Sequence, residues 1–363
     1  MTSHYVRTIQ PRLAFVVAMA TASLLVACGG DSTSSATDSI TYTTINNPAA
    51  TSASDFTSLT GIRGVTSSTD VYITGATIMG GTYSAQLYKG PLTGGGNYYT
   101  MSYPSSSGAT TKTTNSYSAD NLVNGRVHVV GSYNTTQNAN QKGYLYTGPV
   151  VNNPPAGFET LNFPNANITI PHSVMNDLVV GGYEPQPGGL HAFIYKISTG
   201  QFTRLTVMTD KNIAQTAYGV WHNGGTSYTI VGGYTDTSGI EQAYILDYDS
   251  NTGAITNTTA YTYNNQASAL THFEGITTDD AGGYYLAGFG QITAGGAVSC
   301  GIVHITRTPT GFMTKPTWVT APFPGATTQY SNTVYKNNIL GAYSPGPLLL
   351  NGYVANIPIS LIK

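Results

Sequence analysis

Apolar residues alternate with small or polar ones along most of this chain, and the alternation is clearest between Ala217 and Gly253. Three runs in that stretch, AYGVWHN, SYTIVGGY and QAYILDY, have the period of two that is typical of half-buried β-strands. Turn residues separate the runs at 223–225 and 237–239, and a fourth run, ITNTTAYTY, follows. The stretch therefore predicts four consecutive antiparallel strands, which is the size of one propeller blade.

A glycine in the second strand marks each copy of this unit. Six copies are found in this way, at Gly75, Gly131, Gly181, Gly232, Gly288 and Gly341. Intervals of 50 to 56 residues between these glycines, with strands and no helical pattern, are typical of propellers. We predict an all-β fold in which residues 40–363 form a six-bladed β-propeller of four-stranded antiparallel blades.

The last copy determines how the ring closes. It contains the runs NNILGAYS and LLLNGYVANIPISLIK and then ends without a fourth strand. The segment that begins at Ile40, ITYTTINNP, is similar to the fourth-strand runs elsewhere, which stop at a proline. We therefore expect residues 40–48 to supply the missing strand, so that an N-terminal strand closes the propeller and no open edge remains.

The residues before the propeller have a different pattern. Arg7 and Arg12 precede the apolar run LAFVVAMATASLLVA, which is short for a membrane span and has the layout of a secretory signal. The run ends at Leu25-Val26-Ala27-Cys28, which resembles the lipobox of bacterial lipoproteins. The resemblance implies that Cys28 is lipidated and becomes the mature N-terminus, and that Gly29 favours sorting to the outer membrane. The alternative is an ordinary signal peptide with a chance cysteine.

These features divide the chain into three parts. Residues 1–27 are predicted to be a lipoprotein signal peptide, residues 28–39 a flexible polar tether, and residues 40–363 the propeller. Cys300 is the only other cysteine, so no intrachain disulfide can form once Cys28 is lipidated. The formal charge of −2, with 8% charged residues, argues against nucleic acid as a partner. The 27 tyrosines suit hydrogen-bonding contacts with another molecule.

The third copy resembles a known family. Gly189-Leu190-His191-Ala192-Phe193-Ile194-Tyr195 is followed by a Thr-Gly turn and later by AYGV and IVG, and this order is similar to the HAF-type extracellular repeats of bacterial secreted proteins. The resemblance is good for the third and fourth copies and loose in the others. It implies a secreted β-repeat architecture and carries no settled activity.

Common catalytic and metal-binding signatures are absent from the sequence. It has no His-Glu-x-x-His, no cysteine pair for zinc, no Gly-x-Ser-x-Gly and no phosphate-binding loop. The segment from Asp247 to Gly253 alternates oxygen ligands like a calcium loop, but its glycine is one place late and its twelfth position is Thr258. We therefore predict neither a metal site nor a cofactor.

One position of the repeat differs between copies, although the two residues after it follow the same pattern in every copy. Aligning the first strands on a small residue followed by an apolar one leaves a variable position immediately before them, occupied by Arg63, Tyr117, His172, Tyr218, Glu274 and Asn332. First strands line the centre of a propeller, so these side chains are expected to form a ring at one mouth of a central channel. Either they bind a ligand or they plug and hydrate the channel. In both cases a wet channel mouth predicts that they contribute little to folding.

Three functions from different classes remain open. The first is an outer-membrane, lipid-anchored binding module that uses the ring and the Tyr-rich faces to hold a glycan, a peptide or a partner protein. The second is a carbohydrate-active hydrolase or lyase with Glu274 as acid or base and with Arg63 and His172 holding a carboxylate or polarising a carbonyl. Such enzymes need two carboxylates, and the ring offers only Glu274, because Asp120 and Asp177 are expected at a different height. The third is a passive structural lipoprotein.

The lipobox resemblance makes a direct prediction. Cys28→Ser should convert a protein that partitions into detergent into an uncleaved or soluble form, because a multi-acyl anchor retains a protein far better than one chain does. Detergent phase separation of cell extracts measures the change. Partitioning that the substitution leaves unaltered would exclude the anchor.

Overall fold

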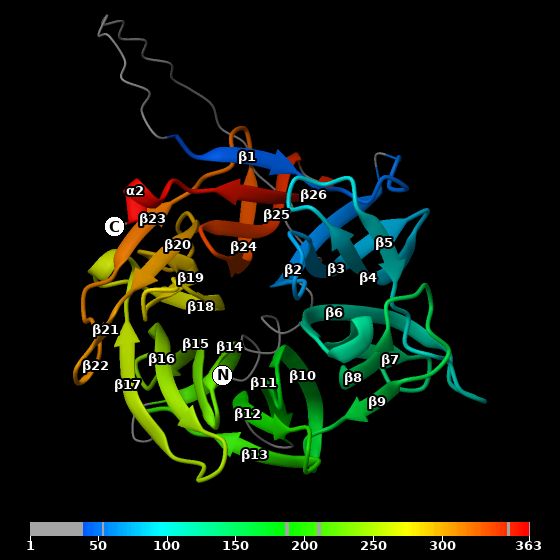
Figure 1. Ribbon diagram of the computed structural model, residues 1–363, viewed down its shortest axis with the longest axis horizontal. Coiled ribbons are helices and arrows are strands. Elements are labelled where there is room, and N and C mark those ends of the chain that lie inside the picture. The colour runs from blue at the N-terminus through cyan, green and yellow to red at the C-terminus, as the bar shows by residue number, and fades with distance from the viewer. Residues whose placement is uncertain (1–38, 53, 186–188, 209–211, 347–348, 363) are drawn as a thin grey trace, which may run out of the picture.

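The fold is described from a computed structural model that covers residues 39–52, 54–185, 189–208, 212–346 and 349–362. Six sheets of four antiparallel strands surround a common axis, as Figure 1 shows. The prediction of a six-bladed β-propeller is therefore confirmed. In each blade the first strand is nearest to the axis and the fourth lies at the outer edge.

Blades 1 to 4 are each built from strands that follow one another along the chain. Blade 1 contains β2 (Phe56–Gly64), β3 (Val71–Met79), β4 (Thr82–Gly90) and β5 (Asn97–Thr100). Blade 2 contains β6 (Thr111–Asn121), β7 (Arg126–Thr135), β8 (Lys142–Pro149) and β9 (Phe158–Leu161). Blade 3 contains β10 (Ala166–Met175), β11 (Leu178–Pro185), β12 (His191–Lys196) and β13 (Gln201–Leu205). Blade 4 contains β14 (Asn212–Gly224), β15 (Ser227–Asp236), β16 (Glu241–Asp249) and β17 (Ile255–Tyr261).

Blades 5 and 6 depart from this plan. Blade 5 contains β18 (Leu270–Thr278), β19 (Tyr284–Gln291), β20 (Ser299–Ile305) and β23 (Thr317–Thr320), with a short hairpin of β21 (Arg307–Thr308) and β22 (Gly311–Phe312) before the last strand. Blade 6 contains β24 (Thr328–Tyr335), β25 (Asn338–Gly346), β26 (Leu349–Asn356) and, at its outer edge, the N-terminal strand β1 (Thr41–Thr44). The C-terminal run expected to be one strand ends at Asn356, and the short helix α2 (Ile359–Ile362) follows.

Each first strand carries a β-bulge, that is, one extra residue opposite the second strand. The bulged residues are Thr60, Tyr117, His172, Tyr218, Glu274 and Asn332. A bulge bends a strand and turns out a side chain, so the propeller presents one such side chain per blade.

The repeated glycine is explained by the same bulge. A Cβ atom at Gly75 would overlap the carbonyl oxygen of Ser58, and one at Gly232 would overlap that of Thr216. Both carbonyls belong to the residue two places before the bulge. The second strand therefore requires glycine for a close backbone approach rather than for a special backbone angle.

Aromatic stacking joins neighbouring blades. The aromatic residue that precedes the proline at the end of a blade stacks on a tyrosine in the second strand of the next blade, and the ring centroids are 3.6 Å apart in each of three such pairs. These pairs are Tyr103–Tyr133, Phe163–Tyr183 and Phe323–Tyr343. Stacked pairs of this kind add to the area that the rings bury, and they fix the blade-to-blade geometry.

The ring closes as expected from the N-terminal segment. Strand β1 pairs antiparallel with β26, from Thr41 opposite Asn356 to Thr44 opposite Tyr353. Beyond the strand, the Ile45 amide donates to the Gly352 carbonyl at 2.8 Å. The Asn46 side chain then donates to Asn351 at 2.6 Å and accepts from the Gly352 amide at 3.0 Å.

This closure predicts different outcomes for two N-terminal deletions of the mature protein. Removing residues 29–38 shortens only the tether and should leave the melting temperature nearly unchanged. Removing residues 29–48 also takes β1 and the Asn46 contacts and exposes the edge of β26, so this variant should aggregate or melt far lower. Thermal unfolding followed by circular dichroism compares the two, and equal melting temperatures would show that β1 does not hold the ring closed.

Candidate functional site

The six bulged residues form the first candidate site, which we call the bulge ring: Thr60, Tyr117, His172, Tyr218, Glu274 and Asn332. All six are half-buried. The Tyr117 and His172 ring centroids are 5.4 Å apart, and those of His172 and Tyr218 are 4.8 Å apart. Asn332 donates to the Leu59 carbonyl at 2.7 Å. Aromatic, amide and carboxylate side chains from successive blades therefore form one surface around the axis.

Five of these residues were predicted from the sequence, and Arg63 was the misplaced one. Thr60 occupies the bulge of blade 1, so the alignment of that copy was shifted by three residues. Both Thr60-Gly61-Ile62 and Arg63-Gly64-Val65 fit a frame of a small residue followed by an apolar one. In the structure Gly61 takes the frame position, because a Cβ there would overlap the carbonyl oxygen of Tyr117 in the next blade.

Arg63 belongs instead to a second ring, three residues beyond each bulge: Arg63, Asp120, Met175, Trp221, Thr277 and Tyr335. Arg63 Nε lies 3.9 Å from Asp120 Oδ1, and its guanidinium is 5.3 Å from the centroid of the Trp221 ring. Arg63 Nη2 also donates to the Val174 carbonyl at 3.3 Å. Arg63 of blade 1 therefore contacts residues of blades 2, 3 and 4. It belongs to the second ring and Glu274 to the bulge ring, so the two side chains do not lie at the same level of the channel, as a shared site was expected to require.

Arg63 is also more buried than a wet channel mouth predicts. The residue is 8% exposed, and its Nε has no hydrogen-bond partner among the described residues. Burial lowers the pKa of the Arg63 guanidinium, and the Asp120 carboxylate opposes that shift. Asp120 in turn accepts the Asn176 amide at 2.6 Å. Arg63 and Asp120 therefore form a packed polar cluster within the second ring.

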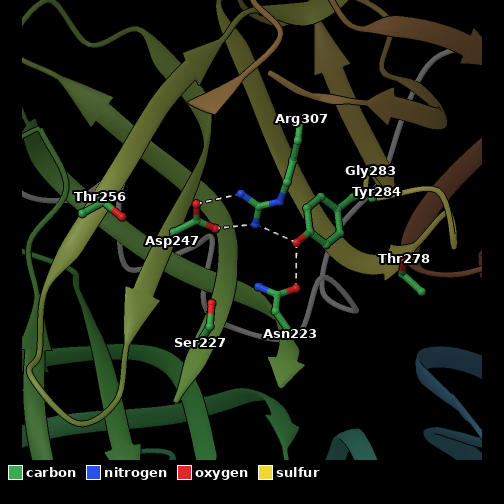
Figure 2. A pocket seen from close by; sticks show the side chains of 9 residues that line it. Asn223, Ser227, Asp247, Thr256, Thr278, Gly283, Tyr284 and Arg307 are labelled. Carbon is green, nitrogen blue, oxygen red and sulfur yellow. Dashed lines mark hydrogen bonds and ion pairs between the residues drawn. The ribbon is translucent and has the colours of Figure 1, made fainter. Parts of the chain in front are cut away.

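A second candidate site is a pocket of about 400 Å³ between blades 4 and 5. Figure 2 shows that Arg307 reaches toward Asp247 of blade 4 and toward Tyr284 of its own blade. The lining residues are Asn223, Ser227, Asp247, Thr256, Thr278, Gly282, Gly283, Tyr284 and Arg307. One side of the pocket is formed by the turns between the first and second strands of blades 4 and 5. The other side is formed by the third and fourth strands of blade 4.

The charged pair in this pocket is held by a dense set of hydrogen bonds. Arg307 binds both oxygens of Asp247, at 2.7 and 2.9 Å, and also donates to Tyr284 Oη at 2.8 Å. The Tyr284 hydroxyl donates to Asn223 Oδ1 at 2.7 Å. The guanidinium carbon is 4.8 Å from the centroid of the Phe312 ring. The fork geometry and the aromatic neighbour fix the arginine in one orientation.

The same bonds set the protonation states. Burial by itself raises the pKa of the Asp247 carboxyl, but hydrogen bonds from Arg307, Asn257 and Thr229 outweigh burial and lower the pKa below its ordinary value. Hydrogen bonding to Asp247 raises the pKa of Arg307. The pair is therefore doubly charged at neutral pH and has no net charge.

The calcium-like segment has another role. Asp249 accepts the Thr252 amide at 2.7 Å and the Asn251 amide at 3.0 Å, which stabilises the hairpin between β16 and β17. A hydrogen bond from the Thr226 hydroxyl, together with those from Thr252 and Asn251, lowers the pKa of Asp249 to about 2. Within the described ranges no three His, Cys, Asp or Glu side chains group closely enough to hold a metal ion.

Comparisons with known proteins add to the description of the fold. A luciferin-regenerating enzyme is similar over 88% of this chain and 95% of its own, with a TM-score of 0.51 and 16% identity. A GH43 endo-arabinanase from Bacillus licheniformis is similar over 82% and 92%, with a TM-score of 0.40 and 13% identity. A GH43_1 enzyme from Xanthomonas citri is similar over 77% and 94%, with a TM-score of 0.42 and 12% identity. At such identities these likenesses concern the fold alone. No protein-family model matches the chain, and neither does any curated protein.

The burial of Arg63 changes the expected effect of replacing it. Arg63→Ala should lower the free energy of unfolding by about 1–3 kcal/mol, because Asp120 loses its cationic neighbour and Trp221 loses its packing partner. Arg126→Ala, a matched change at an exposed arginine, should stay within about 0.5 kcal/mol of the wild type. Urea denaturation measures both. Equal stabilities of the two variants would contradict the packed cluster.

Proposed function

We propose that this protein is an outer-membrane lipoprotein whose propeller is a binding module for a glycan, a peptide or a protein segment, and that the ligand contacts the bulge ring. One observation carries the proposal: all six blades turn out one side chain at the same register position, and five different residue types occupy that position. Repetition of the frame explains the fold, whereas variation at a position that strand pairing does not use is expected of a binding surface. Bulges are frequent next to functional sites for this reason.

The chemistry of the bulge ring suits a polar ligand. Tyr117, His172 and Tyr218 present adjacent aromatic rings, which give contact area at a low cost in conformational entropy. Glu274 and Asn332 add a carboxylate and an amide. A glycan chain or a peptide offers both the apolar faces and the hydrogen-bonding groups that such a surface complements.

The membrane part of the proposal is supported by the sequence around Cys28. This segment lies outside the described residues, and the lipobox-like Leu25-Val26-Ala27-Cys28 is its support. The short helices in the described part of the chain could not cross a bilayer. The HAF-type resemblance of the third blade agrees with a location outside the cytoplasm.

A hydrolase or lyase is the second candidate, and one structural observation favours it. Glu274 is the carboxylate of the bulge ring, and Asp120 lies in the second ring, at another level and beside Arg63, as expected from the sequence. They belong to blades 2 and 5, which face each other in a ring of six. Two carboxylates on opposite sides of a bound sugar are the groups that acid–base glycoside cleavage requires.

One experiment separates these functions. A protein that begins at residue 39 is screened on glycan and peptide arrays, and hits are titrated against the Glu274→Gln and Tyr218→Phe variants. The matched controls are Glu159→Gln and Tyr99→Phe, in the outer strands β9 and β5. A binding module predicts at least about tenfold weaker binding by the ring variants, a loss of about 1.4 kcal/mol, with the controls unchanged.

The remaining outcomes decide among the other functions. Products that the wild type releases from a glycan hit and that Glu274→Gln does not release would indicate the enzyme. Hits that the ring variants bind normally would remove the ligand from the bulge ring. The absence of any hit would favour the passive structural lipoprotein.

A further inference from the structure

The pocket between blades 4 and 5 is polar, and its charges cancel. Its volume of about 400 Å³ lies within the range of small-molecule sites. Arg307 and Asp247 are its charged lining residues, and they neutralise each other through two hydrogen bonds. The remaining side chains are hydroxyls, an amide and a phenol. Such a lining disfavours an apolar ligand, because polar groups would lose their contact with water without gaining partners.

The pocket is also organised in advance of binding. Asp247, Thr229, Tyr284 and Asn223 fix one edge of the Arg307 guanidinium. Arg307 donates its hydrogen bonds within the described residues from Nη1 and Nη2 and none from Nε, and the arginine side chain is 32% exposed. A rigid, partly exposed guanidinium edge loses little entropy when it donates to an incoming oxygen atom.

Exposed hydroxyls complete the set of hydrogen-bonding groups. Ser227 and Thr256 are exposed and lie on the blade 4 side of the pocket, while Thr278 of blade 5 is half-buried. A hydroxyl both donates and accepts, so these groups suit a ligand whose own groups do the same. Neighbouring hydroxyls of a sugar have this property.

The charges at the rim argue against an anionic ligand. Asp249 is paired in register with the pocket residue Ser227, and Asp279 accepts the amide of the pocket residue Gly283 at 2.7 Å. Hydrogen bonds lower the pKa of Asp249 to about 2. Asp279 is buried and bound to His304 Nε2 at 2.8 Å, so Asp249 is the carboxylate that, next to the neutral Arg307–Asp247 pair, disfavours a carboxylate or a phosphate at this edge.

We propose that this pocket is a binding site for one neutral carbohydrate residue, whose adjacent hydroxyls are held by Arg307 and by the hydroxyls of Ser227, Thr256 and Thr278. The site is separate from the bulge ring and does not depend on it. The β21–β22 hairpin of blade 5 carries Arg307 across to blade 4 and places Phe312 over its guanidinium.

Ligand-observed NMR on the full propeller tests the proposal. The probes are the methyl glycosides of glucose, galactose and mannose, compared with the corresponding uronates and with inorganic phosphate. Thr256→Tyr fills the pocket from the exposed strand β17, and Arg307→Lys keeps the charge but loses the fork. Thr203→Tyr, a matched change on the exposed outer strand β13, is the control. We expect at least one neutral glycoside to bind, with at least about tenfold weaker binding by both pocket variants and normal binding by the control.

Several results would overturn the site. These are the absence of binding by every neutral glycoside, tighter binding of uronates or phosphate, or normal binding by Thr256→Tyr. Glu274→Gln should bind the glycosides like the wild type. If Glu274→Gln abolishes binding and Thr256→Tyr does not, the sugar binds at the bulge ring, and the pocket proposal fails while the proposed function stands.

Discussion

The propeller depends on one close backbone contact that recurs from blade to blade. The bulge in each first strand is paired with a glycine in the second strand, and in five blades a side chain there would overlap the carbonyl oxygen two residues before the bulge. At Gly288 the obstacle is instead the side chains of Val303 and Trp318. The glycine allows the bulge, and the bulge turns one side chain out of the ladder. That side chain is then free to differ between blades, because the fold does not use it for strand pairing.

This contact is also why the sequence predicted the fold so fully. The glycine has no substitute, so it marks the period, and the period with its alternating strands predicts the blades and their number. The N-terminal closure was predictable because Ile40 begins a run that resembles the other outer strands. The stacking of Tyr103, Phe163 and Phe323 on the next blade was not predicted, although their shared place before a proline is visible in the sequence.

The sites were only partly predictable, for physical reasons. Thr60 and Arg63 both precede a glycine and an apolar residue, and only the register of β2 against β3 in the folded blade decides between the two alignments. The pocket was missed because Arg307 lies on a hairpin inserted in blade 5, and no repeat pattern relates it to Asp247. The segment that begins at Asp247 has a spacing similar to that of a calcium loop, from which no metal site was predicted, and the arginine and the hairpin turn that its carboxylates bind were not predicted either. Contacts between side chains of different blades cannot be recognised from a local sequence pattern.

The pairing of β1 with β26 determines the order in which the molecule can be completed. Thr41 is among the first described residues, and its partner Asn356 is among the last. An outer strand that must find a partner more than 300 positions later closes the longest loop in the fold, and contacts of that kind form late. Five blades can assemble while the chain is still being synthesised, but the sixth needs both ends. A truncated or stalled chain is therefore left with two unpaired strand edges, which gives proteases and chaperones a direct means of distinguishing finished from unfinished copies.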